Sequence, residues 1–304
     1  MEYNKKYIGI DIGGSHIRVA LIQNLKILDF EDKYISPDEV ETERKSKTML
    51  KNTIKELYEK ILQNNKLQKK DIEKIGVCVP GFYNNGILYK AKNLNINKYE
   101  LLKDLKEIFG ENKIHCLNDA AASTVTEMKE GSLKGTKNAL FIALGTGIGG
   151  RFIINGKIVN KDNTEMGHVL FKYNGKKCNC GKRGCAEQYI SMKALKDRLK
   201  SELETDKHID LNELDYTNPK VLKIINIYTF QLASFLVSFL ELFNLEKIVL
   251  GGSLSELKTK KIYMKLLKKY ININKLNFEK KPKIELAHFK NNAGIFGAIL
   301  DDEN

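Results

Sequence analysis

KYIGIDIGGSHIRVALI, the segment Lys6–Ile22, consists of two apolar stretches joined by a pair of glycines. Short apolar stretches that flank a tight turn predict two antiparallel strands. The segment KILDFEDKYI follows at once and predicts a third strand. The arrangement returns in the second half of the chain as NALFIALGTGIGGRFIINGK, residues 138–157. Because a meander of strands begins each half and alternating strands and helices follow it, we expect two related α/β lobes.

The segments between and after these meanders predict the remaining elements. Helices are expected over about 39–65 and 98–109 and from residue 118 on, with strands at KIGVCVPG and KIHCL. The strands KIVLGG and KPKIELAHF and the closing helix NAGIFGAILDD complete the second half. We therefore place a small lobe at residues 1–117 and a larger lobe at 118–291, with a helix over 292–304 packing back on the first lobe. A ligand is expected in the cleft between the lobes.

The composition is that of a globular protein: 42% of the 304 residues are hydrophobic and 29% are charged. The formal net charge of +13 comes from scattered lysines, which favours a solvated basic surface over a nucleic-acid site. The start of the chain does not resemble a signal peptide, so we expect a cytoplasmic protein. The most apolar segment, Ile224–Phe243, contains Asn226, Gln231 and Glu241, which favours a buried or interface helix over a membrane span.

The turn DIGGS, Asp11–Ser15, has two possible explanations. Glycine supplies the positive φ that a tight hairpin needs, without any further role. Alternatively, the glycines let backbone N–H groups approach a phosphate while Asp11 helps to hold Mg²⁺. LGTGIGG, Leu144–Gly150, lies at the equivalent place in the second half, and a strand follows it, unlike a Walker or Rossmann loop. Two such turns at matching places favour binding of the phosphates of a nucleotide.

The cysteines predict a metal site. Three of the five lie within eight residues, Cys178, Cys180 and Cys185, with His168 ten positions ahead of the first. In a reducing compartment, clustered cysteines favour a metal over a disulfide. The alternative is a buried group without a metal. Cys78 and Cys116 lie in apolar strands and are expected to be core thiols.

Six segments, IGIDIGGS, GVCVPG, LNDAAAS, LGTGIGG, EMGH and CNCGKRGCAE, occur in an order that resembles the ROK family (repressor, open reading frame, kinase). The resemblance extends from Ile8 to about Ala298, and the cysteine segment most resembles the glucokinase branch. It implies an α/β, two-lobed actin/hexokinase-like (ribonuclease H-like) fold with a ligand cleft between the lobes.

The same resemblance implies a structural Zn²⁺ held by His168, Cys178, Cys180 and Cys185. Four protein ligands leave no open position on the metal, so this zinc would support the chain rather than take part in the chemistry. The sugar-binding residues that the resemblance implies are Asn93, Asn118, Asp119, Glu165, His168 and Glu187. Surface charge and helix capping are the alternatives for the glutamates and for the Asn-Asp pair.

Catalytic and nucleotide-binding roles also follow from the resemblance. Asp119 would be the general base that takes the proton of the attacking hydroxyl. The nucleotide-binding residues implied are Asp11, Gly13, Gly14, Ser15, Gly145, Thr146, Gly147, Gly149, Gly251 and Gly252. Three features depart from the family pattern: Arg151 stands where a further glycine is common, the loop VNKDNTEMGH is short and lacks the usual glycines before Glu165, and Ser15 replaces a usual threonine.

We therefore expect an ATP-dependent sugar kinase that uses Mg²⁺ and converts glucose to glucose 6-phosphate. N-acetylmannosamine and N-acetylglucosamine are the alternative substrates. A sugar-sensing regulator of the same family is the alternative of a different class, although no DNA-binding helices precede Tyr7 in this sequence. A zinc-dependent nucleic-acid binder is supported only by charge and cysteines. The expected partners are sugar and ATP and a second copy of the chain in a homodimer, with neither nucleic acid nor membrane.

Overall fold

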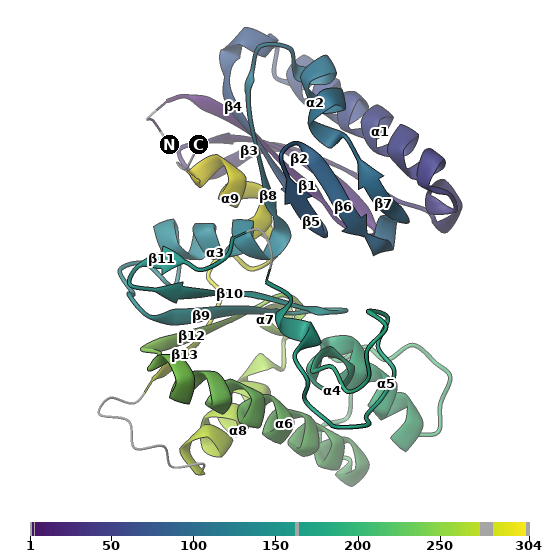
Figure 1. Ribbon diagram of the computed structural model, residues 1–304, viewed down its shortest axis with the longest axis vertical. Helices are drawn as coiled ribbons and strands as arrows, with labels where there is room; N and C mark the ends of the chain where they lie inside the picture. The colour runs from purple at the N-terminus through teal and green to yellow at the C-terminus, as the bar shows by residue number, and fades with distance from the viewer. Residues whose placement is uncertain (1, 3, 162–163, 274–281, 302–304) are drawn as a thin grey trace. The chain divides into compact units, whose positions relative to one another are not determined.

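A computed structural model describes residues 2, 4–161, 164–273 and 282–301 (Figure 1). The chain forms two compact units. Unit 1 contains the chain up to Lys129, a short stretch beginning at Lys161, and the chain from Asn292 on. Unit 2 contains Glu130–Asn160 and Thr164–Asn291. The predicted boundary at residue 117 is therefore too early, and the last residues of the predicted closing helix, 302–304, lie outside the described part of the chain.

A five-stranded sheet forms the centre of unit 1, in the order β3-β2-β1-β4-β8. Its strands are β1 (Lys6–Ile12), β2 (His16–Gln23), β3 (Lys26–Tyr34), β4 (Ile72–Val79) and β8 (Lys113–Asn118). The first three pair antiparallel as a meander, and β4 and β8 join parallel to β1. The predicted meander and the two following strands are thus confirmed for this half of the chain.

Helices cover this sheet, and a second, small sheet lies beside it. Helix α1 (Glu43–Asn64) packs on β2 and β3, and α2 (Leu101–Phe109) packs on α1. The small antiparallel sheet consists of β5 (Phe82–Asn84), β6 (Ile87–Ala91) and β7 (Ile96–Tyr99), which the sequence pattern did not predict. Short 3-10 helices complete this part of the unit: η1 (Pro37–Val40), η2 (Lys69–Asp71) and η3 (Lys92–Leu94).

Helix α9 (Ala293–Leu300) returns from the end of the chain and packs on β1, β4 and β8, as expected. Its approach to β4 is close, because a Cβ at Gly76 would lie 2.7 Å from the backbone nitrogen of Ile299. Helix α3 (Asp119–Glu130) packs on α9 as well, and Thr126 Oγ1 donates a hydrogen bond to the Ala293 carbonyl at 2.6 Å. This packing explains why α3 belongs to unit 1 rather than to the second lobe.

Unit 2 contains a sheet with the same plan, in the order β11-β10-β9-β12-β13. Its strands are β9 (Ala139–Leu144), β10 (Ile148–Ile154), β11 (Lys157–Ile158), β12 (Lys247–Gly251) and β13 (Lys283–Leu286). As in unit 1, the first three pair antiparallel and the last two pair parallel. The repeated order confirms the prediction of two related α/β lobes.

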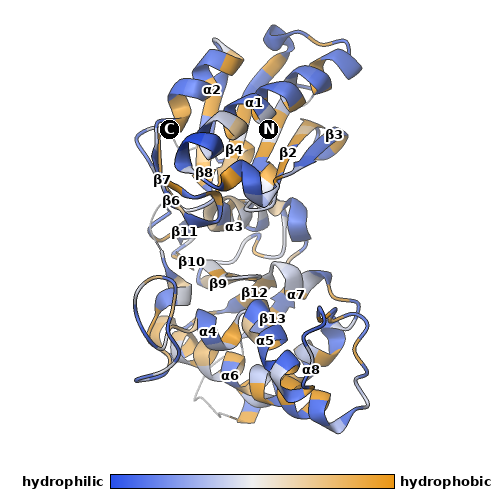
Figure 2. Ribbon diagram, turned by 90° about the vertical axis from the view of Figure 1, so that its right-hand side faces the viewer, coloured by the Kyte–Doolittle hydropathy of each residue, from blue (hydrophilic) through white to orange (hydrophobic). Residues whose placement is uncertain are grey.

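The helices of unit 2 enclose its own hydrophobic core. They are α4 (Glu187–Ile190), α5 (Met192–Glu202), α6 (Pro219–Phe243), α7 (Ser253–Glu256) and α8 (Lys260–Ile273), with the 3-10 helix η4 (Met166–His168). A further 3-10 helix, η5 (Lys290–Asn292), includes the last residues of unit 2 and the first residue of the returning unit 1 segment. Among the described residues, α6 alone is long and apolar enough to cross a bilayer, but half of its most apolar window is buried within the protein. Hydrophobic and hydrophilic residues also alternate along α6 (Figure 2). Both features are typical of the core helix of a globular domain, as predicted.

Candidate functional site

The first glycine turn connects β1 to β2 through Gly13, Gly14 and Ser15. The Gly13 N–H donates to the His16 carbonyl at 2.8 Å, and the Ser15 carbonyl accepts from the Ile35 N–H at 2.8 Å, so the base of the turn is fixed while Gly14 and Ser15 are exposed. Asn93, from η3, packs against this turn, since a Cβ at Gly14 would lie 2.8 Å from the Cβ of Asn93. The structure thus brings the predicted sugar-binding Asn93 to the predicted phosphate turn.

Asp11 lies on β1, in the second residue pair from this turn, and forms an ion pair with Arg18 on the neighbouring strand β2. The two residues are direct partners in the antiparallel register of β1 and β2. Arg18 was not among the site residues predicted from the sequence, although counting outward from the hairpin places it opposite Asp11. Because both side chains are largely buried, with 25% of Arg18 and 15% of Asp11 exposed, their pairing fixes the orientation of the Asp11 carboxylate.

Asn118 and Asp119 begin helix α3. The Asn118 Oδ1 accepts from the Ala120 N–H at 3.1 Å, so Asn118 caps the helix, and its Nδ2 donates to the Gly81 carbonyl at 2.7 Å. Asp119 stands in the first turn with an exposed side chain, and its Oδ1 also accepts from the Ala120 N–H, at 2.7 Å. The positive end of the helix dipole favours the ionised form of a carboxylate at this place.

Cys78 and Cys116 lie on β4 and β8 and are buried, as predicted for core thiols. Burial raises the pKa of Cys78 well above its ordinary value, and the nearby carboxylates of Asp11 and Asp119 raise it further. Burial also raises the pKa of Cys116 to about 12. Both thiols therefore remain protonated at neutral pH and do not act as nucleophiles or metal ligands.

The second glycine turn, Gly145–Gly147, joins β9 to β10 and is built like the first. The Gly145 N–H donates to the Gly147 carbonyl at 3.0 Å, which leaves Thr146 exposed at the tip. The carboxylate of Glu187 lies against this turn, because its Oε2 accepts from the Ile148 N–H at 3.0 Å and would lie 2.5 Å from a Cβ at Gly147. The predicted sugar-binding Glu187 and the predicted phosphate turn are therefore in contact.

The other predicted nucleotide-binding glycines of unit 2 lie in or beside strands. Gly149 is within β10 and pairs with Ala143 of β9. Gly251 ends β12 against the ring of Phe141, and Gly252 follows with φ +68°. A Cβ at Gly252 would lie 2.7 Å from the Leu144 carbonyl oxygen, so only glycine fits there.

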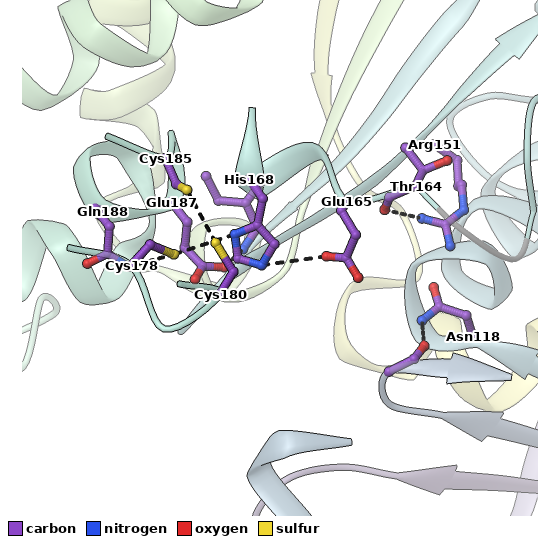
Figure 3. A network of polar contacts seen from close by, with 12 residues as sticks. Asn118, Arg151, Thr164, Glu165, His168, Cys178, Cys180, Cys185, Glu187 and Gln188 are labelled. Carbon is purple, nitrogen blue, oxygen red and sulfur yellow. Dashed lines mark hydrogen bonds and ion pairs between the residues drawn. The ribbon is translucent and has the colours of Figure 1, made fainter. Parts of the chain in front are cut away.

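His168, Cys178, Cys180 and Cys185 form a compact group whose four ligand atoms all lie within 4.8 Å of one another (Figure 3). The His168 Nδ1 is 3.5 Å from the Cys178 Sγ, and the Sγ atoms of Cys180 and Cys185 are 3.5 Å apart. A tetrahedral ion bonded to sulfur at about 2.3 Å and nitrogen at about 2.0–2.1 Å separates two sulfurs by about 3.8 Å and sulfur from nitrogen by about 3.6 Å. The group therefore fits a four-coordinate metal ion.

The surroundings of this group favour metal binding over a disulfide. The described thiols are all free, and the Gln188 amide donates to the Cys178 Sγ at 3.6 Å, as residues around metal-bound thiolates do. Burial raises the pKa of Cys185 to about 12, and the neighbouring thiols add to this effect. Burial disfavours the Cys180 thiolate too, but hydrogen bonds from the Lys182 backbone and from neighbouring thiols outweigh it and lower the pKa of Cys180. A bound cation would hold all three sulfurs as thiolates.

The imidazole of His168 presents its second nitrogen to Glu165. Its Nε2 is 3.6 Å from the carboxylate of Glu165, whose side chain is 68% exposed (Figure 3). The His168 N–H also donates to the Glu165 carbonyl at 3.0 Å, so the short helix η4 fixes the two residues relative to each other. One ring nitrogen of His168 thus points to the thiols, and the other lies beside an exposed carboxylate.

A separate hollow of about 600 Å³ lies in unit 1 beside η1 and α1, between Lys33, Arg44 and Asn52. It contains none of the predicted site residues. Its open, mixed-charge lining offers no convergent set of groups for chemistry.

The relatives of this chain include proteins of different function. A glucokinase of Halalkalibacterium halodurans is 29% identical over 96% of this chain and 93% of its own length. A xylose repressor of Bacillus spizizenii is also 29% identical, over 84% of this chain and 67% of the repressor. An N-acetylmannosamine kinase of Haemophilus influenzae is 25% identical over 96% of this chain and 93% of the kinase.

The fold is that of a solved structure, a ROK family glucokinase from Streptomyces griseus in complex with glucose and AMPPNP. The TM-score is 0.81 at 21% identity, over 96% of this chain and 97% of that chain. The predicted α/β, two-lobed actin-like fold is therefore confirmed. The family model that the chain matches is that of the ROK family, and because the match extends over residues 7–300, the chain belongs to the ROK family.

Proposed function

We propose that this protein is an ATP-dependent sugar kinase that transfers the γ-phosphoryl group of Mg-ATP to a hexose, with the 6-hydroxyl of glucose as the first candidate acceptor. The observation that carries the proposal is the exposed carboxylate of Asp119 in the first turn of α3. The amide of Asn118 already caps this helix, so a carboxylate is not needed at position 119 as a cap.

Asp119 has the chemistry of a general base. Its carboxylate would accept the proton of the sugar hydroxyl while the hydroxyl oxygen attacks the γ-phosphorus and ADP leaves. The Ala120 N–H bond to Oδ1 holds the carboxylate in place, and the helix dipole keeps it ionised. A protein that only senses sugar needs a hydrogen-bonding group at this position but no base.

Glu165, His168 and Glu187 would bind sugar hydroxyls, together with Asn93 and Asn118. The support for this assignment is the arrangement in unit 2, where the Nδ1 of His168 lies near the Cys178 thiol and its Nε2 lies near the Glu165 carboxylate. We propose that the metal is Zn²⁺ and that it is structural, held by His168 and the three cysteines. It would supply rigidity to the segment that carries the sugar-binding groups, with no open coordination position for chemistry.

The two glycine turns would bind the phosphates of ATP through their backbone N–H groups, and Asp11 would assist the Mg²⁺ that accompanies the nucleotide. The support is their common construction in the two units: in each, a three-residue turn joins an antiparallel pair and exposes its tip. The further nucleotide contacts proposed are at Gly149, Gly251 and Gly252.

Similarity to a xylose repressor favours a second candidate, a sugar-binding regulator without phosphoryl transfer. Similarity to an N-acetylmannosamine kinase favours a third, the same reaction on an N-acetylated hexosamine. Release of ADP, coupled to oxidation of NADH and measured against a panel of glucose, mannose, xylose, N-acetylmannosamine and N-acetylglucosamine, separates the three. The proposal predicts ADP release that depends on glucose. If only an N-acetylated hexosamine causes ADP release, that sugar replaces glucose as the proposed substrate. If none of the sugars in the panel causes ADP release, kinase activity is contradicted.

We also expect a homodimer in the cytoplasm. The support for a dimer is the surface of α6, where Leu222, Ile227 and Phe230 are 37–48% exposed. Light scattering during size-exclusion chromatography measures the mass directly, and a mass of one chain, 34.7 kDa, would contradict the dimer.

A further inference from the structure

Arg151 is a fully buried arginine on β10, with 2% of its surface exposed. A buried guanidinium is costly unless hydrogen-bond acceptors surround it, so its contacts indicate which parts of the chain it holds together.

The Arg151 Nη1 donates two hydrogen bonds to backbone carbonyls, to Gly150 at 2.8 Å and to Thr164 at 3.2 Å (Figure 3). Gly150 is its own neighbour on β10, whereas Thr164 ends the short loop before Glu165. The Thr164 Oγ1 in turn donates to the Asn160 carbonyl at 3.1 Å. The end of the loop is therefore bound to the strand by the guanidinium and to its own beginning by a hydroxyl.

The residues after Thr164 continue this contact with β10. Met166 is buried, and a Cβ at Gly150 would lie 3.1 Å from its Sδ. Glu165 lies between these two contacts and accepts the His168 N–H at 3.0 Å. The direction in which Glu165 and His168 leave the strand is thus set on one side by the Arg151–Thr164 hydrogen bond and on the other by Met166.

We propose that Arg151 is a positioning residue that fixes Glu165 and His168 for sugar binding and thereby sets sugar affinity and the discrimination between sugars. This proposal rests on the sugar-binding role proposed above for these two side chains. Glu165 has a mostly exposed side chain and few other contacts to fix it, so loss of the carbonyl contact one residue earlier would let it move.

The test compares Arg151→Met with a matched control, Arg198→Met. Arg198 is a half-buried arginine of the same unit whose Nη2 donates to the Gln231 Oε1 at 3.0 Å, remote from Glu165 in the chain. Calorimetry measures the Kd of glucose and of N-acetylmannosamine without nucleotide, and separately the Kd of ATP. Zinc content and circular dichroism establish that each variant is folded.

Loss of a hydrogen bond to a charged group weakens an interaction by roughly tenfold to a hundredfold. We therefore expect Arg151→Met to weaken sugar binding by about tenfold or more and to change the ratio of the two sugar affinities, with the Kd of ATP within about twofold of wild type. Arg151→Lys keeps the charge and one donor and should restore part of the affinity. Arg198→Met should leave the Kd of both sugars unchanged while lowering stability.

Thr164→Val removes only the hydroxyl that closes the loop, at a partly exposed position, and should weaken sugar binding by a few-fold with no loss of fold. It decides the matter if Arg151→Met does not fold. If Arg151→Met folds and binds sugar as tightly as wild type, the inference is overturned. If Arg151→Met does not fold, unchanged sugar affinity in Thr164→Val overturns it. Sugar binding by the wild type without any sugar-dependent ADP release would contradict the proposed kinase and leave this test intact, whereas no binding of any sugar would overturn both.

Discussion

Replacement of Gly147 by alanine tests the contact between the second glycine turn and Glu187. The new methyl group would lie 2.5 Å from the Glu187 Oε2, closer than a side-chain carbon and an oxygen can approach. The carboxylate is the end of a flexible side chain, so it can move aside. In moving, it gives up the hydrogen bond that it accepts from the Ile148 N–H at 3.0 Å.

The size of the effect follows from these contacts. A hydrogen bond to a charged group contributes about 1.5–3 kcal/mol, and Gly→Ala restricts the unfolded chain, which stabilises by about 0.4–1 kcal/mol. The net expectation for Gly147→Ala is a loss of about 1–2 kcal/mol in the free energy of unfolding. Gly145→Ala is the matched control in the same turn, because the nearest atom to its Cβ is the Ser253 Oγ at 3.9 Å. That variant should be as stable as wild type or slightly more stable.

Urea unfolding followed by tyrosine fluorescence measures the difference, since the chain has 13 tyrosines and no tryptophan. With a slope of about 2–3 kcal/mol per M, the Gly147→Ala midpoint should fall by about 0.3–1 M relative to that of Gly145→Ala. In a Glu187→Ala background, the penalty of Gly147→Ala should disappear, because the group that it displaces is absent. Equal midpoints for the two single variants, or a penalty that persists without Glu187, would refute the proposed contact.

Three further predictions concern the metal, the sugar and pH. Elemental analysis should find about one zinc per chain, and Cys178→Ser should lower that content together with the stability of the surrounding segment; a folded wild type without metal would contradict the assignment. Glu187→Ala should weaken sugar binding in the absence of nucleotide by about tenfold or more in calorimetry, and unchanged affinity would remove Glu187 from the sugar site. Burial disfavours the ionised form of Asp301, but hydrogen bonds from His115 and Lys161 outweigh it and hold its pKa below the ordinary 3.8. Because the folded pKa is lowered, Asp301 stabilises the protein above pH 3.8 and loses this effect as the pH falls. Asp301→Asn should therefore lower the thermal midpoint more at pH 7 than at pH 3, and equal losses at both would count against the ion pairs.

Much of the fold could be predicted because its signals are local. The apolar strands and the glycine turns are continuous segments, and their recurrence indicated the repeated sheet. The pairing of Asp11 with Arg18 could have been predicted as well, since a three-residue turn determines the register of the strands beside it.

Other features depend on contacts between distant parts of the chain. The small sheet β5–β6–β7 was missed because its strands have only three to five residues and no clear alternation. The assignment of α3 to unit 1 follows from its packing on α9, which lies at the other end of the chain. The contact of Arg151 with the Thr164 carbonyl depends on the path of a loop, which no periodic pattern records.

We propose that Asp119 makes this member of the ROK family an enzyme. Asparagine is nearly isosteric with aspartate, accepts the same Ala120 N–H and can hydrogen-bond a sugar hydroxyl, but it cannot take the proton. The decisive measurement is the kcat of sugar-dependent ADP release by wild type and by Asp119→Asn, with sugar affinity measured on both by calorimetry. If Asp119 is the general base, Asp119→Asn loses about 10²–10⁴-fold in kcat while its sugar affinity stays close to that of wild type. Turnover by Asp119→Asn equal to that of wild type, or a wild type that binds sugar and releases no ADP, would contradict it.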